Sequence, residues 1–204
     1  MAIIKSGATS DQLTIDATSK ALRNTPYDSD GTYRGKKQTY RASTVSTVVA
    51  PAGTVSFFAI SGSATKTIRI QKIRISGFTL TTLAVNDVHV KKYSTILSGG
   101  TATALVQVPL DSTFGAGTVG LLNVYTVAPT EGTLVGTIAG SRRIFKSSTV
   151  VDGADFPDIE FIFGQNQESI CPTLRGTSQY IGVNFGSAPA TAVTLTIEVE
   201  WTEE

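Results

Sequence analysis

The end of the chain carries its clearest alternation of apolar and polar side chains. From Val193 to Trp201 every odd position is large and apolar, and every even position is Thr or Glu. Side chains on a β-strand point alternately to its two faces, so this segment has one dry face and one wet face. A single strand cannot bury five large side chains by itself. The pattern therefore predicts a terminal strand that packs on a sheet formed by the preceding residues.

Shorter segments of the same kind recur from Thr44 onward, separated by turns rich in Gly, Pro and Ser. About eight to ten strands in about 160 residues, with no convincing helix, predict an all-β antiparallel sandwich. A jelly roll with two sheets of four strands fits the count best, because an immunoglobulin-like sandwich usually needs fewer residues. The expected strands are 45–49, 55–60, 67–75, 78–83, 134–138 and 143–145, with further runs around Val88, Ala102, Leu122, Ile159 and Ile181.

One expected strand changes phase in its middle. Ile68 and Ile70 share one parity, whereas Ile73 and Ile75 share the other. Either a β-bulge restores the register there or the strand passes from one sheet to the other.

Three other runs bear on which faces are buried. Phe57 and Phe58 are adjacent and are expected on opposite faces. The strand around Leu122 is apolar on both faces, so both are expected to be covered. In the run that ends at Pro109, four small or apolar side chains share one face: Ala102, Ala104, Val106 and Val108.

Residues 1–43 lack this long periodicity, and three of the six tyrosines fall within fourteen residues of this segment. We expect an extended N-terminal arm, with two short strands, that is ordered against a partner; the alternative is a flexible tail with chance tyrosines. The domains expected are thus an anchoring arm (1–43) and a sandwich (44–204). The residues expected to bind the partner are Leu13, Ile15, Arg23, Tyr27, Tyr33, Arg34, Lys36, Lys37, Tyr40 and Arg41.

Composition narrows the functional classes. The 204 residues are 41% apolar and 16% charged, which supports one large domain with a core. Residues 1–43 hold seven Lys/Arg and four Asp, but this excess is too sparse for a nucleic-acid interface. No run approaches the roughly 20 apolar residues of a membrane span, and the N-terminus does not resemble a signal peptide. We therefore expect a soluble chain made in a cytosol, with neither nucleic acid nor membrane as partner.

Candidate catalytic chemistry is sparse. The single cysteine, Cys171, excludes an internal disulfide and is expected to be a buried thiol, while the single histidine, His89, is expected on an exposed face. These two residues cannot build a zinc site of soft ligands or a histidine-based triad. Four carboxylates could in principle do acid–base work, but their surroundings indicate a loop rather than a cleft: Asp152, Asp155, Asp158 and Glu160. We expect no enzyme, no metal and no cofactor.

Several stretches together resemble structural proteins encoded among the virion genes of tailed bacteriophages. The opening, residues 6–23 (SGATSDQLTIDATSKALR), is similar to the start of phage virion proteins that anchor there to the particle. The other stretches are 56–75 (SFFAISGSATKTIRIQKIRI), 88–94 (VHVKKYS), 132–136 (GTLVG), 174–179 (LRGTSQ) and 198–204 (EVEWTEE).

The resemblance implies a setting rather than a chemical activity. It implies a virion protein, made in the host bacterial cytoplasm, that decorates or cements the head and binds the major capsid protein or another virion protein. A homo-oligomer is expected, a trimer above all, because oligomers of one chain are usually symmetric and capsids have local three-fold positions. Two alternatives remain: a head–tail connector, collar, fibre-base or baseplate component, and a carbohydrate-binding module for host attachment.

Overall fold

The structure is a computed structural model of the 204-residue chain. It describes residues 37–44, 54–79, 85–147, 158–164, 171–189 and 192–204, and the backbone alone of residues 14–15, 22–23, 47–49 and 84. The chain forms two compact units, Met1–Gln38 and Thr39–Glu204. In the first unit, β1 (Thr14–Ile15) pairs antiparallel with β2 (Leu22–Arg23).

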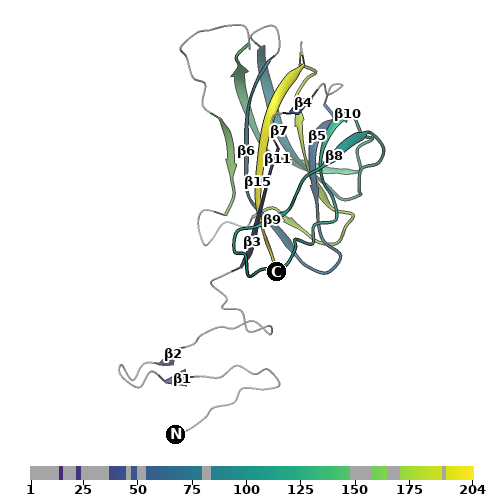
Figure 1. Cartoon of the computed structure of the whole chain (residues 1–204). Helices are drawn as coiled ribbons and strands as arrows, with labels where there is room; N and C mark the ends of the chain where they lie inside the picture. The colour runs from purple at the N-terminus through teal and green to yellow at the C-terminus, as the bar shows by residue number, and fades with distance from the viewer. Residues whose placement is uncertain are drawn as a thin grey trace. The chain divides into compact units, whose positions relative to one another are not determined.

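The second unit is an all-β sandwich of two antiparallel sheets, which confirms the expected fold class (Figure 1). The part of the chain that the structure describes contains no helix. The six-stranded sheet has the order β11 (Leu134–Phe145), β7 (Ala84–Tyr93), β14 (Tyr180–Phe185), β5 (Ser56–Ser61), β10 (Leu122–Val127) and β8 (Thr101–Ala104).

The other sheet has seven strands. Its main order is β12 (Ile159–Ile162), β6 (Ile68–Thr79), β15 (Val193–Glu203), β3 (Gln38–Ser43) and β9 (Val108–Pro109). Two short strands complete it: β4 (Thr47–Val49) pairs with β15, and β13 (Thr173–Leu174) pairs with β6. The counts of six and seven differ from the expected four and four, because several short strands add to the edges of both sheets.

The terminal strand, β15, lies at the centre of the seven-stranded sheet, as its alternation predicts (Figure 1). It pairs with β6 along its whole length, and its five large apolar residues are all buried in the core. The same parity continues to Glu203, so this carboxylate also lies on the inner face and is buried.

Two β-bulges decide the register of the core strands. In the pairing of β6 with β15, Lys72 lies opposite Glu200 and Ile70 lies opposite Trp201, so Gln71 has no partner residue on β15. This bulge lets the isoleucines on both sides of it point inward. The phase change is therefore a bulge, not a change of sheet. A second register shift lies in β5, where Ser56 pairs with Asn184. It brings both Phe57 and Phe58 into the main core, so the expectation of opposite faces is wrong.

The sandwich begins earlier in the chain than the sequence suggests. The expected boundary lies after residue 43, but β3 is hydrogen-bonded into the seven-stranded sheet between β15 and β9. The compact unit that holds the sandwich therefore starts at Thr39.

A second, smaller apolar cluster lies on the outer face of the six-stranded sheet. Its members are Ala59, Tyr93, Leu97, Tyr125 and Tyr180, with Leu121 packed against them. The strand β10 contributes to both clusters, since Leu122 and Val124 lie in the main core. Both faces of this strand are covered, as expected.

Candidate interaction surfaces

The structure describes only part of the set of residues expected to bind a partner. Ile15 and Arg23 lie in β1 and β2, where only the backbone is described. Lys37 is exposed and immediately precedes β3. Five of the expected residues lie outside the described residues: Leu13, Tyr27, Tyr33, Arg34 and Lys36.

The last two expected residues are used within the sandwich itself. The Tyr40 ring is buried and stacks on Trp201, with ring centroids 5.8 Å apart, and its hydroxyl donates to the Gly115 carbonyl at 3.1 Å. Burial, and then the nearby Glu203 carboxylate, raise the pKa of the Tyr40 phenol. Arg41 is exposed but donates to the Glu200 carboxylate at 2.7 Å.

Glu203 connects this aromatic pair to the loop that contains Thr118. Its carboxylate accepts hydrogen bonds from the Thr118 backbone N–H and hydroxyl, both at 2.9 Å, and from the Trp201 indole at 3.1 Å. Three donors satisfy a buried carboxylate, which would otherwise be costly to keep out of water. The Glu203 group is therefore structural, because all its described partners belong to the fold.

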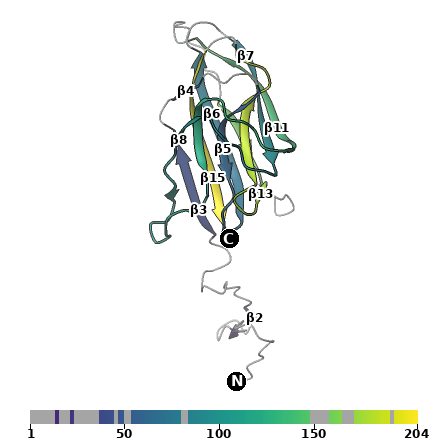
Figure 2. The same cartoon turned by 90° about the vertical axis from the view of Figure 1, so that its right-hand side faces the viewer.

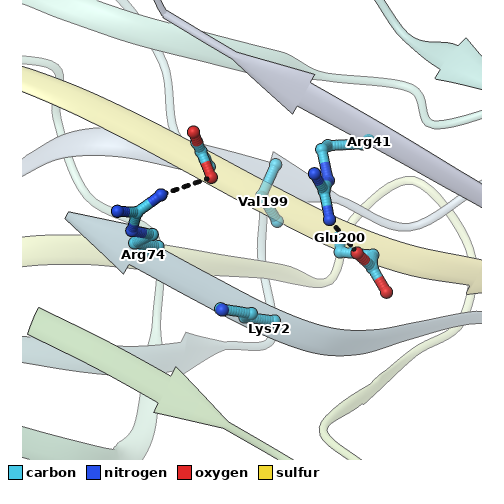
Figure 3. A pocket seen from close by; sticks show the side chains of 6 residues that line it. Arg41, Lys72, Arg74, Val199 and Glu200 are labelled. Atoms are coloured by element: carbon cyan, nitrogen blue, oxygen red, sulfur yellow. Dashed lines mark hydrogen bonds and ion pairs between the residues drawn. The ribbon is translucent and has the colours of Figure 1, made fainter.

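The outer face of the seven-stranded sheet is a lattice of ion pairs. A small pocket on this face is lined by Arg41 of β3, Lys72 and Arg74 of β6, and Glu198 to Glu200 of β15 (Figure 3). Arg74 also donates to Asp158 beside β12, with Nε at 2.8 Å from Oδ2.

Charges of opposite sign alternate from strand to strand across this face. Lys72 lies 2.7 Å from Glu160, and Arg74 lies 3.6 Å from Glu198. The hydrogen bond that Lys72 donates outweighs desolvation and lowers the pKa of Glu160. The hydrogen bond that Arg74 donates to Asp158 raises the pKa of Arg74. Because these cations already have carboxylate partners, the face is a weak candidate for binding an anionic ligand.

The outer face of the six-stranded sheet is built in a different way, with loops lying over aromatic rings. The rings of Tyr93 and Tyr180 stack in parallel, 4.4 Å apart with an interplanar angle of 1°. The Tyr180 hydroxyl donates to the Glu131 carboxylate and accepts from the Gly132 N–H at 3.0 Å. The other oxygen of Glu131 accepts from the Ser56 backbone N–H at 2.5 Å. Glu131 thus pins its loop to two strands of the sheet.

Burial controls the acid–base properties of this cluster. It is the main cause that raises the pKa of Tyr93 to about 12, and it also raises the pKa of Tyr125 and Tyr180. The Asn184 side chain and the Ser56 hydroxyl are buried nearby without hydrogen bonds of good geometry. The tyrosines are therefore held neutral, and they lack the exposure that proton transfer to a ligand would require.

Among the described residues of the sandwich, two outer segments each carry several exposed apolar side chains. The first, called here the β11 edge, lies on the outermost strand of the six-stranded sheet and consists of Leu134, Val135, Ile138 and Ile144. The second, called here the β8–β9 segment, lies at the opposite side of the sandwich (Figure 2). It consists of Ala102, Ala104, Val106, Val108 and Leu110.

The β8–β9 segment corrects what its sequence pattern suggests. The four residues expected to share a face are all exposed, but the structure does not place them on one face, because β8 and β9 belong to different sheets and all of β8 is exposed. Val106 is 77% exposed, and Val108 and Leu110 are about half exposed at 49% and 53%. The regular strand breaks between β8 and β9, and Leu105 supplies the inward contact.

The residues considered for catalysis are dispersed. His89 is half-buried, not freely exposed, and lies beside Gly140 and Gly186. Cys171 is also half-buried, and its thiol lies 3.4 Å from the Gln71 carboxamide oxygen. Asp158 and Glu160 are ion-paired, while Asp152 and Asp155 lie outside the described residues. No group of three His, Cys, Asp or Glu side chains within the described ranges is placed to hold a metal ion.

Two further findings bear on ligand classes. Trp201 is fully buried, and every tyrosine whose side chain the structure describes is buried as well, so none of these rings is free to stack on a sugar. In the described part of the chain, no helix has the length and apolar character needed to cross a membrane.

Two structural carboxylates escaped the sequence analysis. Glu203 could have been found, because its parity places it on the dry face of the last strand. Glu131 could not, because it lies in a loop, and only the fold brings it to Tyr180, 49 residues away.

Comparison with protein-family models, with curated proteins and with solved structures finds no match for this chain.

Proposed function

We propose that this chain is a structural protein of a tailed-phage particle, a head decoration or cement protein that associates with copies of itself through its sandwich. The observation that carries the proposal is the pair of exposed apolar surfaces on a sandwich whose interior is filled. Large aliphatic side chains gathered on a surface mark interaction sites in soluble proteins.

The construction of the sandwich suits such a role. The sheets contain two sets of four strands, β3-β15-β6-β12 and β5-β14-β7-β11, and β10 and β8 extend the second set. Along the chain these eight strands pass from one sheet to the other at each step except from β7 to β11, which pair with each other. This order supports the jelly-roll expectation, and jelly rolls are common in viral capsid proteins. The sandwich has one large core and no disulfide, since the chain has a single cysteine.

The N-terminal segment is the proposed attachment to the particle. Because Tyr40 and Arg41 are engaged within the sandwich, the attachment rests on the expected residues that precede β3. The partner would be the major capsid protein or another protein of the shell. The chain would be made in the host bacterial cytoplasm and incorporated into the virion.

The test is the composition of purified particles. Quantitative mass spectrometry should find the chain in many copies per particle, and a chain lacking residues 1–36 should fold but be absent from the particles. Particles that lack the chain should release their DNA at a lower temperature than particles that contain it. A few copies per particle would instead assign the chain to a connector, collar, fibre-base or baseplate. Absence of the full-length chain from the particles would contradict the proposal.

A further inference from the structure

We infer that a single buried water molecule binds between Ser56 and Asn184 and joins β5 to β14 across the bulge in their pairing. The site lies on the outer face of the six-stranded sheet, beside the tyrosine cluster. The inference does not depend on the proposed function, because it concerns a ligand inside the sandwich rather than a partner of the particle.

The bulge places two polar side chains opposite each other in the middle of the sheet. Ser56 and Asn184 pair on β5 and β14, where the register shifts by one residue. Val183 and Phe185 point into the main core, so Asn184 between them points to the outer face. The extra residue of the bulge, Phe57, also turns inward, which leaves Ser56 on the outer face as well.

A glycine allows the Ser56 hydroxyl to reach over β14. A Cβ atom at Gly182 would lie only 2.1 Å from Ser56 Oγ and 3.3 Å from Cε2 of the Tyr93 ring, so any other residue would displace one of them. Burial raises the pKa of Tyr93, and Ser56 and Asn184 lie close enough to its phenol to oppose that rise. Neither of them makes a hydrogen bond of good geometry with it.

Three polar atoms meet here without a hydrogen-bond partner among the described residues. They are Ser56 Oγ and both amide atoms of Asn184, Nδ2 and Oδ1. Ser56 is 1% exposed and Asn184 is 0% exposed, so bulk solvent does not reach them. Native proteins rarely leave buried polar groups unpaired, because the loss of their contacts with water is costly. A ligand that pairs with all three atoms removes this cost.

The chemistry of the three atoms selects the ligand. The amide offers one kind of donor, Nδ2–H, and one acceptor, Oδ1, while the hydroxyl can act as either. A metal cation would pair with the oxygens and leave Nδ2 unsatisfied. An anion would leave Oδ1 unsatisfied and would meet the Glu131 carboxylate, which binds the Ser56 N–H. The ligand is therefore neutral and both donates and accepts. Water fits, because a buried water molecule typically makes about three hydrogen bonds to such groups.

The bound water would replace a contact that the bulge removes. A bulge leaves one residue of its strand outside the ladder and weakens the pairing there. A molecule bonded to side chains of both strands holds the register that turns Phe57 and Phe58 inward. Because Asn184 is fully buried, exchange of this water with bulk solvent requires local opening of the protein.

Oxygen-17 relaxation dispersion of the full chain counts the water molecules that remain bound for longer than the protein takes to tumble. Asn184→Leu replaces the amide by an apolar group of similar size and should lower this count by about one. Ser56→Ala removes one of the three contacts and should lower the same signal with less disturbance of the fold.

Ser61→Ala is the matched control. Ser61 lies on the same strand and is equally buried, but its hydroxyl donates to the Gly62 carbonyl at 3.1 Å and accepts from the Leu121 N–H at 2.8 Å. This variant should not lower the count. A count that stays unchanged in folded Asn184→Leu and Ser56→Ala would overturn the inference, and so would an equal fall in Ser61→Ala.

A crystal structure of the full chain tests the identity of the ligand, and it remains decisive if Asn184→Leu does not fold. The expected density lies about 2.7–3.2 Å from both Nδ2 and Oδ1 of Asn184. Density surrounded by oxygen atoms alone would identify a cation and overturn the inference. Direct pairing of the Asn184 amide with other protein groups would also overturn it.

Discussion

The outer faces of the two sheets are stabilised by different kinds of contact. Both sheets bury their inner faces in one core, and the outer face of each sheet must be compatible with water. The seven-stranded sheet does so with ion pairs open to solvent, such as Arg41 with Glu200. The six-stranded sheet covers its tyrosines with loops that Glu131 holds in place.

This difference determines how much each residue matters. Exposed ion pairs are screened by water and salt, and single pairs contribute little to stability. Buried polar contacts leave costly unpaired groups when one partner is lost. We therefore expect the six-stranded face to be sensitive to substitution and the seven-stranded face to be tolerant.

The largest effect is expected from Tyr180→Ala, which removes both a stacked ring and a buried hydroxyl. The variant should lose about 3–5 kcal/mol of unfolding free energy, since a large side chain leaves a cavity beneath the loops. Tyr180→Phe keeps the ring and separates the two contributions; it should lose about 1–3 kcal/mol, because one Glu131 oxygen loses its donor and the Gly132 N–H loses its acceptor. Urea denaturation measures both, and equal losses in the two variants would show that the ring itself contributes nothing.

Glu131→Ala should come next. It removes the acceptor of the Ser56 N–H and of the Tyr180 hydroxyl, at an expected cost of about 1–3 kcal/mol. Hydrogen exchange should increase first in the 128–133 loop and at Ser56. Unchanged exchange at both places would mean that the loop is held without this carboxylate.

Two residues, one on each outer face, should make stability depend on pH at opposite ends of the scale. Burial raises the pKa of Tyr93 from about 10 to about 12, so the unfolded chain loses this proton first, and stability falls as pH rises from about 10 to 12. The pKa of Glu160 is lowered by Lys72, so its contribution is present above pH 4.5 and is lost as pH falls below that value.

Two variants isolate these slopes. Tyr93→Phe should make the alkaline part of the stability–pH curve less steep, without abolishing its slope, because burial also raises the pKa of Tyr125 and Tyr180. Glu160→Gln should likewise make the acid part less steep, and each variant should leave the other part unchanged. Thermal unfolding from pH 2 to 12 measures this. A change in the acid part for Tyr93→Phe would contradict the assignment.

The smallest effect is expected from Arg74→Ala, although Arg74 has several carboxylate neighbours. Its loss of stability should be smaller than that of Tyr180→Phe and should vanish at 1 M salt, because the pairs are exposed and screened. A loss that persists at high salt would show that the lattice contributes through packing, and the contrast between the two faces would weaken.

Part of the candidate surface was within reach of the sequence. Alternation singled out Ala102, Ala104, Val106 and Val108, but it could not tell that all four are exposed, because period two is the same for a core strand and for a surface strand. Nor could it tell that β8 and β9 join different sheets. The basic and aromatic character of residues 1–43 led to Tyr40 and Arg41 as partner-binding residues. Their contacts with Trp201 and Glu200 depend on a strand 159 residues later in the chain.

The sequence by itself determined the fold class and the inner face of the last strand, because the two-residue period of side chains is a local property of extended backbone. It also determined that Ile70 and Ile73 conflict in phase. Only the tertiary structure decided that a bulge resolves this conflict, that Phe57 and Phe58 both point inward, and which apolar faces are left uncovered. These depend on the register between strands far apart in the chain, which no local pattern specifies.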